Sequence, residues 1–192
     1  FYLAFGAVDP SGKRVLLALD VSGSMDGGEC AGVPGLTPRV GSSAMALVTA
    51  ATEKSHAFVA FTSGAPGEWV SRSGRSAWAN YRAGVTEVAI SPRQRLDEVC
   101  DRVRRLPMGG TDCALPMLWA MERKVDVDTF CIYTDSETWA GDVHPIQALR
   151  MYRDRTGIPA RLVVVGMVSN GFTIADPDDA GMLDVVGFDT AA

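Results

Sequence analysis

The sequence predicts an α/β fold in which a mainly parallel central sheet is flanked by helices on both faces. Short continuous apolar runs, typical of strands that are buried on both sides, recur along the chain. Segments with helical periodicity alternate with these runs, as they do in parallel sheets. With 47% hydrophobic and 21% charged residues, the 192 residues can bury one core and fit a single domain over 1–192.

The first half of the chain contributes three expected strands and one helix. The apolar run at 15–19 (VLLAL) predicts the first strand, and the run at 56–61 (HAFVAF) predicts the second. Between them, 42–54 is rich in Ala and opens with serines that can cap a helix. Residues 63–84, rich in Gly, Ser, Arg and Trp, indicate an insertion or surface hairpin, and a strand is expected at 85–90.

The second half is expected to add three helices and two strands. Leu96, Val99 and Val103 share one helical face, so an amphipathic helix should run from about here to Pro107. A helix at 114–124, a strand at 129–133, a helix at 144–155 and a strand at 161–167 follow in order. The acidic tail from Ser169 is assigned no element. We therefore expect a Rossmann-like sheet with one antiparallel edge strand.

Composition excludes several classes of function. A net charge of -5 argues against a broadly basic nucleic-acid surface, and no apolar run reaches the roughly 20 residues of a membrane helix. The chain starts at Phe1 without a signal peptide, so we expect a domain of a longer, cytoplasmic protein. The four cysteines (Cys30, Cys100, Cys113 and Cys131) form no C-x-x-C pair, which predicts reduced thiols and no zinc site.

Charge is unevenly distributed along the chain. Residues 66–110 hold eight Arg against five acidic residues, while 120–192 hold six basic and twelve acidic residues. Either the first region is a solvated Arg-rich helix, or it is a basic patch for an anionic partner. Trp69, Trp78 and Tyr81 lie among these arginines and could stack on bases, although such residues more often pack a hairpin onto the core, which is the interpretation favoured here.

Oxygen-bearing side chains gather where the predicted strands and loops end. Asp20, Ser22 and Ser24 follow the first strand, the loop 109–112 (GGTD) precedes a helix, and 134–137 (TDSE) follows the strand at 129–133. Ligands of open α/β sheets bind beyond the carboxyl ends of the strands, so these groups should meet at one edge. Because all of them are hard oxygen donors, they favour Mg²⁺, with Mn²⁺ or Ca²⁺ as alternatives, over zinc or copper.

Simpler interpretations exist for each group taken alone. Ser22 and Ser24 could cap a helix, and Thr111 and Asp112 could be ordinary turn residues. His144 before Pro145 is typical of a helix start. The acidic run at 176–179 (DPDD) fits either a turn or a second cation site.

The runs LLALDVSGSM, GGTD and YTDSET resemble the three loops of the metal-ion-dependent adhesion site in von Willebrand factor A domains. The resemblance implies a divalent cation that is held by Asp20, Ser22, Ser24, Thr111 and Asp135, with Asp135 acting through a water. It also implies that an acidic group of a protein partner completes the coordination.

A closer resemblance spans nearly the whole chain. The stretches RLPMGGTDCALPMLWA, YTDSETWAGDVHPIQALRMYR and SNGFTIADPDD are similar to the von Willebrand A domain of Ro autoantigen proteins, with a departure at about 63–90. Members of that family act in noncoding RNA quality control as ribonucleoproteins. The resemblance implies that small Y-type RNAs bind to a ring of helical repeats, which these residues do not include. It implies no catalysis.

Two alternative functions are kept. Asp20 at a strand end could be the nucleophile of a Mg²⁺-dependent phosphatase, although Ser22 stands where such enzymes carry a second carboxylate. The chain could also be a generic protein–protein adhesion module. No P-loop motif is present, which excludes nucleotide binding of that type.

Overall fold

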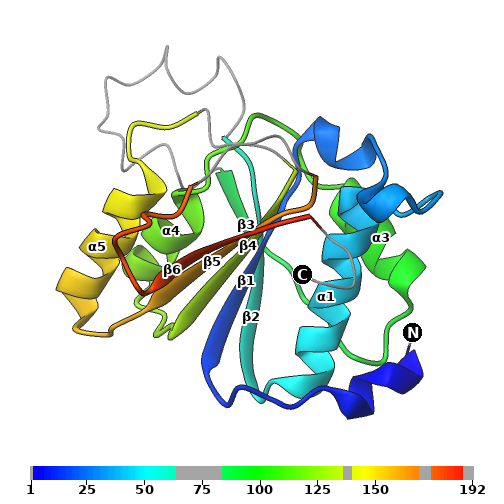
Figure 1. Cartoon of the computed structure of the whole chain (residues 1–192), viewed down its shortest axis with the longest axis horizontal. Helices are drawn as coiled ribbons and strands as arrows, with labels where there is room; N and C mark the ends of the chain where they lie inside the picture. Colours follow the sequence, from blue (N-terminus) through cyan, green and yellow to red (C-terminus); the bar gives the residue numbers. More distant parts are fainter. Residues whose placement is uncertain (1, 64–83, 136–139, 169–173, 188–192) are drawn as a thin grey trace.

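A six-stranded sheet forms the centre of the protein in the computed structural model, which describes residues 2–63, 84–135, 140–168 and 174–187 (Figure 1). The strand order is β3-β2-β1-β4-β5-β6. The strands are β1 (Arg14–Asp20), β2 (Ser55–Phe61), β3 (Val85–Glu87), β4 (Thr129–Thr134), β5 (Arg161–Gly166) and β6 (Met182–Val186). All pairs are parallel except β2 with β3, which is antiparallel.

The α-helices of the described residues cover both faces of the sheet (Figure 1). The side of α1 (Pro38–Thr52) and α3 (Leu96–Arg104) receives Leu17 and Leu19 of β1. The side of α4 (Leu115–Arg123) and α5 (Pro145–Thr156) receives Leu16 and Ala18. Alternation along a strand sends successive side chains to opposite faces, and an apolar run therefore feeds both cores. Short 3₁₀ turns complete the described elements: η1 (Tyr2–Ala7), η2 (Gly23–Asp26) and η3 (Cys30–Gly32).

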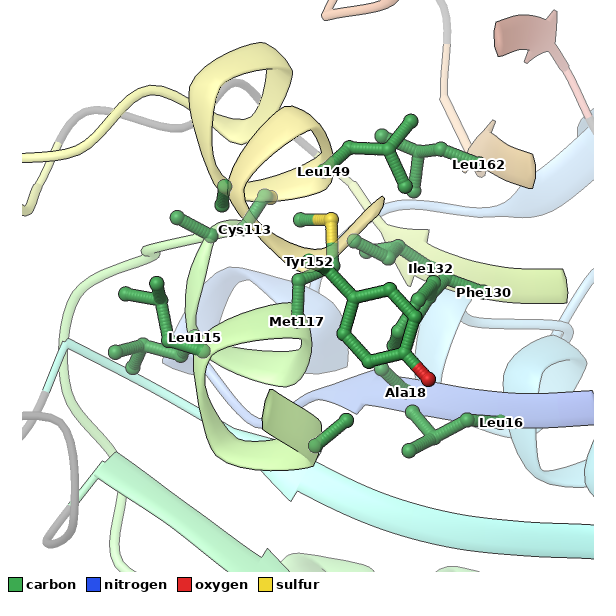
Figure 2. Close-up of a cluster of buried hydrophobic side chains, with 14 of the residues drawn as sticks. Leu16, Ala18, Cys113, Leu115, Met117, Phe130, Ile132, Leu149, Tyr152 and Leu162 are labelled. Carbon is green, nitrogen blue, oxygen red and sulfur yellow. The ribbon is translucent and has the colours of Figure 1, made fainter. Parts of the chain in front are cut away.

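Tyr152 is the largest side chain that α5 contributes to its core (Figure 2). Its ring packs edge-on against Phe130 of β4, with centroids 4.9 Å apart. Its hydroxyl donates to the carbonyl of Val125 at 2.8 Å and accepts the Val127 N–H at 2.8 Å. The phenol thus fills the core while it satisfies the backbone that leads into β4.

The predicted fold class is confirmed, including the antiparallel edge strand, but several boundaries differ. Strand β3 covers only 85–87 of the expected 85–90. Helix α1 begins at Pro38 rather than at 42, with Thr37 as its N-cap, because Pro at the first position and a capping hydroxyl start a helix without an apolar signal. The residues Trp69, Trp78 and Tyr81 lie outside the described part of the chain.

Strand β6 was missed by the sequence analysis. Its five residues pair in parallel with β5, from Leu162 with Met182 to Gly166 with Val186. Leu183 and Val186 are half exposed and Asp184 sits in the middle, so the strand lacks the continuous apolar run that marks β1 and β4. Asp184 accepts the N–H groups of Ile174 and Ala175, which ties the preceding turn to this edge.

Two expectations from composition can be compared with the structure. The four cysteines, all in described segments, form no disulfide. Within the described residues, no helix has the length and apolar character that crossing a bilayer requires.

Candidate metal centre

Asp20 ends β1 and lies at the centre of the candidate site. Its side chain is completely buried. Oδ1 accepts the N–H of Ser22 at 2.7 Å, and Oδ2 accepts the hydroxyls of Thr134 at 2.7 Å and Thr111 at 3.3 Å. The carboxyl ends of β1 and β4 are neighbours in the sheet, which is why residues 114 positions apart can bond here.

The two serines continue this network toward the surface. Ser22 Oγ lies 3.1 Å from Ser24 Oγ, and Ser24 Oγ donates to Asp135 Oδ1 at 3.2 Å. Ser22 and Asp135 are buried, whereas Ser24 is exposed. The structure therefore brings all five predicted site residues into one hydrogen-bonded group with an opening at Ser24.

Thr134 belongs to the same group and was not among the predicted site residues. Its position between the end of an apolar strand and Asp135 is the signal that could have identified it. As the shortest donor to Asp20 Oδ2, it fixes the orientation of the central carboxylate.

The end of β2 positions the GGTD loop. Ser63 N–H donates to the Gly110 carbonyl at 2.6 Å, the Thr62 hydroxyl donates to the same oxygen at 3.0 Å, and Gly110 N–H donates to Ser63 Oγ at 2.9 Å. These bonds hold the peptide just before Thr111. The sequence analysis gave no role to Thr62, which stands at a strand end like Asp20.

Asp112 has a separate, structural role at the start of α4. Its Oδ1 accepts the N–H of Ala114 at 3.0 Å, so turn chemistry explains Asp112 but not Thr111. Burial raises the pKa of Asp112 to about 6, and the charge of Asp142 adds to the effect. Gly141 packs directly on this carboxylate, since a Cβ there would lie 2.2 Å from Oδ2 at a φ of +93°.

The electrostatics of Asp20 suit a cation. Burial raises the pKa of Asp20, the hydrogen bonds from Ser22 and Thr134 lower it, and the neighbouring charge of Asp135 raises it further. The carboxylates of Asp20 and Asp135 thus lie close together. None of the contacts described above joins a basic side chain to either carboxylate. A positive ion would offset the cost of keeping both ionised.

The donor chemistry fits a hard dication. The described residues contain no cluster of three or more His, Cys, Asp or Glu side chains that could hold a metal, so an ion at this edge would need hydroxyl oxygens among its ligands. Ser24 and Thr111 direct their hydroxyl hydrogens to carboxylates, which leaves oxygen lone pairs for an ion. Hydroxyl and carboxylate oxygens are the ligands that Mg²⁺, Mn²⁺ and Ca²⁺ prefer.

Capping and turn chemistry were the simpler interpretations of several candidate residues, and the hydrogen bonds differ from one position to the next. Ser22 is the N-cap of η2, yet its side chain makes no capping hydrogen bond. His144 does cap α5, since its Nδ1 accepts the N–H of Ile146 at 3.3 Å. In the acidic run, Asp176 pairs with Arg150 at 2.8 Å and Asp179 with Arg153 at 2.5 Å.

Two arginines of the Arg-rich region form ion pairs with nearby acidic residues in the described chain. Arg95 pairs with Asp97 at 3.0 Å, and Arg104 pairs with Asp101 at 3.2 Å. Arg102 donates to the carbonyl of Ala89. Arg72, Arg75 and Arg82 lie outside the described residues.

Comparisons with known proteins agree on one family. A family model for the Ro60 vWA domain matches residues 14–192. The chain is 46% identical over all 192 residues to the RNA-binding protein RO60 of Deinococcus radiodurans and 41% identical to that of Caenorhabditis elegans. It spans 32% and 26% of the length of these two relatives.

One solved structure shows the same family, and a second shows the fold alone. The Deinococcus radiodurans RO (RSR) protein matches with a TM-score of 0.83 and 45% identity, over 99% of this chain and 34% of that one. Proximal thread matrix protein 1 from the mussel byssus shares the fold, with a TM-score of 0.54 and 12% identity over 92% of this chain and 44% of that one. The chain therefore belongs to the Ro60 von Willebrand factor A domain family.

Proposed function

We propose that this chain is a divalent-cation-dependent binding domain of a Ro-type RNA-binding protein. The cation, Mg²⁺ in our proposal, is held by Asp20, Ser22, Ser24, Thr111 and Asp135. The observation that carries the proposal is the convergence of these side chains, from three separated loops, in one hydrogen-bonded group at the carboxyl edge of the sheet.

The hydroxyls and carboxylates have different tasks in this proposal. Ser22, Ser24 and Thr111 present neutral oxygens to the ion, while Asp20 and Asp135 accept hydrogen bonds from them and supply the negative charge. When bound, the cation offers a Lewis-acidic position to a carboxylate of a protein partner. Ser24 is exposed, so this position is reached from its side of the site.

The names of two relatives support the RNA-binding part of this proposal. Both are named RNA-binding proteins, and this chain covers a third or less of their length. We infer that the complete protein acts in noncoding RNA quality control in the cytoplasm, as part of a ribonucleoprotein. Its small Y-type RNA binds to a helical-repeat ring outside these residues, which accords with the acidic net charge of -5.

The burial of Asp20 favours a binding function over catalysis by this residue. A phosphoryl-accepting Asp20 would need a free carboxylate oxygen exposed to substrate, but both oxygens accept hydrogen bonds and the side chain is completely buried. The enzyme alternative predicts turnover of an aryl phosphate that is lost in Asp20→Ala. We expect no turnover with Mg²⁺ present, even at high protein concentration.

Calorimetry with Mg²⁺ and with Mn²⁺ tests the proposal. The wild-type chain should bind one ion, and Asp20→Ala should abolish binding while circular dichroism shows an intact fold. Asp179→Ala is the matched control, because it removes an ion-paired aspartate on the β5–β6 connection and should leave the affinity unchanged. Ion binding that survives in Asp20→Ala would overturn the assignment of this site.

A further inference from the structure

Arg39 is a completely buried arginine next to the candidate metal centre. It lies in the first turn of α1, and its side chain has 0% exposure. Arginine is almost never fully buried unless it is paired, because removing its charge from water is costly. Arg39 therefore needs an explanation beyond the filling of the core.

The guanidinium of Arg39 holds both ends of the turn that carries Ser24. Its Nε donates to Asp26 Oδ1 at 2.7 Å, and its Nη2 donates to the carbonyl oxygen of Ser22 at 3.1 Å. Ser22 precedes η2 and Asp26 is its last residue, so Ser24 lies between the two anchored points. One side chain thus connects α1 to the backbone that presents both serine hydroxyls.

Asp26 is also approached from α3. Arg104 Nε lies 3.7 Å from the same oxygen of Asp26. Asp26 and Arg104 are 36% and 52% exposed, so solvent screens this outer pair. The Arg39 side of Asp26 is shielded from water, which makes Arg39 the main anchor of the turn.

Folding stability alone is a weak reason for this arrangement. Buried ion pairs are often no more stabilising than apolar residues of similar size. Within the described residues, Nη1 of Arg39 also lacks a hydrogen-bond partner, so its burial is not fully compensated. The planar fork of arginine can hold a carboxylate and a carbonyl at a fixed angle, whereas lysine presents a single point charge.

We propose that Arg39 is a positioning residue of the cation site. It fixes the turn from Ser22 to Asp26 before the ion arrives, so that binding does not have to order the two serine hydroxyls. The inference rests on the proposed cation binding, and it adds a residue that neither touches the ion nor belongs to the predicted ligands.

Three variants separate positioning from general stability. Arg39→Met keeps an unbranched side chain as far as the position of Nε but removes both hydrogen bonds, and Arg39→Lys keeps the charge. Arg153→Met is the matched control, because Arg153 also bonds an aspartate (Asp179, 2.5 Å) and a carbonyl (Ala160, 2.8 Å), at the amino end of β5. For each, Mn²⁺ affinity is measured by calorimetry, and unfolding by urea and amide hydrogen exchange are measured in EDTA.

Arg39→Met should bind Mn²⁺ at least tenfold more weakly than wild type, and Arg39→Lys should recover part of that loss. In EDTA, the amides of Met25 and Gly27, which bond to Ser22 and Ser24 carbonyls, should exchange faster in Arg39→Met. Arg153→Met should be destabilised but should keep its Mn²⁺ affinity within twofold. If Arg39→Met does not fold, Asp26→Asn is expected to weaken Mn²⁺ binding in the same direction.

Two results would overturn the inference. One is a folded Arg39→Met with Mn²⁺ affinity within twofold of wild type, and the other is unchanged exchange at Met25 and Gly27. A wild-type chain that binds no Mn²⁺ would instead refute the proposed function. Exchange in EDTA would then still decide whether Arg39 holds the turn.

Discussion

Single side chains hold the proposed cation site in place before an ion binds. Asp20 is buried with donors on both oxygens, and the donors come from the backbone of Ser22 and the hydroxyls of Thr111 and Thr134. These bonds orient the carboxylate before any ion is present. A preformed site loses less entropy on binding than one that must be ordered.

Removal of the Thr134 hydroxyl should therefore weaken the site. Thr134→Val is expected to lower Mg²⁺ affinity severalfold, because Asp20 loses its shortest side-chain donor, at 2.7 Å. The free energy of unfolding should fall by about 1 kcal/mol, the usual contribution of one hydrogen bond. Calorimetry and urea unfolding measure both quantities. Thr134→Ser retains the hydroxyl and should behave like wild type, and an equal loss in that variant would contradict the explanation.

The sequence indicated that oxygen-bearing side chains of three loops meet at one sheet edge, because the strand ends of a parallel sheet lie there. The resemblance to von Willebrand factor A domains then selected five of them: Asp20, Ser22, Ser24, Thr111 and Asp135. The strand-end positions of Thr134 and Thr62 can be read from the sequence, but their hydrogen-bond partners cannot. Their roles depend on which oxygen each hydroxyl reaches across the sheet. Arg39 precedes the helix that was expected at 42–54, so no pattern in the sequence marked it as a buried residue. Spacing in a sequence carries no information about such contacts.

Elements were predictable where the apolar pattern was continuous. Strands β1 and β4 are buried on both sides and stand out as unbroken hydrophobic runs. Strand β6 lies at the sheet edge with Asp184 in its middle, and only pairing with β5 makes it a strand. The start of α1 was missed for a related reason, since a cap and a proline, not an apolar face, define it.

Tyr152 packs helix α5 onto the sheet, and a substitution at this residue tests how much its hydroxyl stabilises the fold. Tyr152→Phe keeps the ring against Phe130 but removes the hydroxyl that bonds Val125 and Val127. The free energy of unfolding should fall by about 1–3 kcal/mol, because the buried N–H of Val127 loses its partner. Urea unfolding in EDTA checks this value. A variant as stable as wild type would mean that water replaces the hydroxyl.

At the scale of the whole molecule, charge pairs connect distant parts of the chain and make its stability depend on pH. Arg14 at the start of β1 bonds Asp128 just before β4, at 2.6 Å. The hydrogen bonds from Arg14 lower the pKa of Asp128 from 3.8 to about 2. A lowered pKa in the folded state means that the unfolded chain takes up the proton first as pH falls.

The stabilisation from Asp128 should thus be complete above about pH 4 and lost as pH falls toward 2. Asp128→Asn should lower the free energy of unfolding at pH 7 by about 1 kcal/mol, discounted because both partners are partly exposed to solvent. The difference from wild type should shrink as pH falls through the folded-state pKa of about 2. Urea unfolding between pH 2 and pH 7 tests this, and a difference that does not depend on pH would contradict it.

The acidic net charge leads to a prediction for RNA. A chain of net charge -5, with Arg95 and Arg104 paired to neighbouring acids, should not retard a structured RNA at about 50 mM salt in a gel-shift assay. Binding that weakens steeply as salt rises would instead place RNA contacts within these 192 residues.

The central claim is that three separated loops hold one divalent cation, and anomalous diffraction from a crystal soaked in Mn²⁺ tests it most directly. The account predicts an anomalous peak within coordination distance of the hydroxyl oxygens of Ser22, Ser24 and Thr111. No peak at this edge of the sheet under saturating Mn²⁺, with the loops ordered, would contradict it.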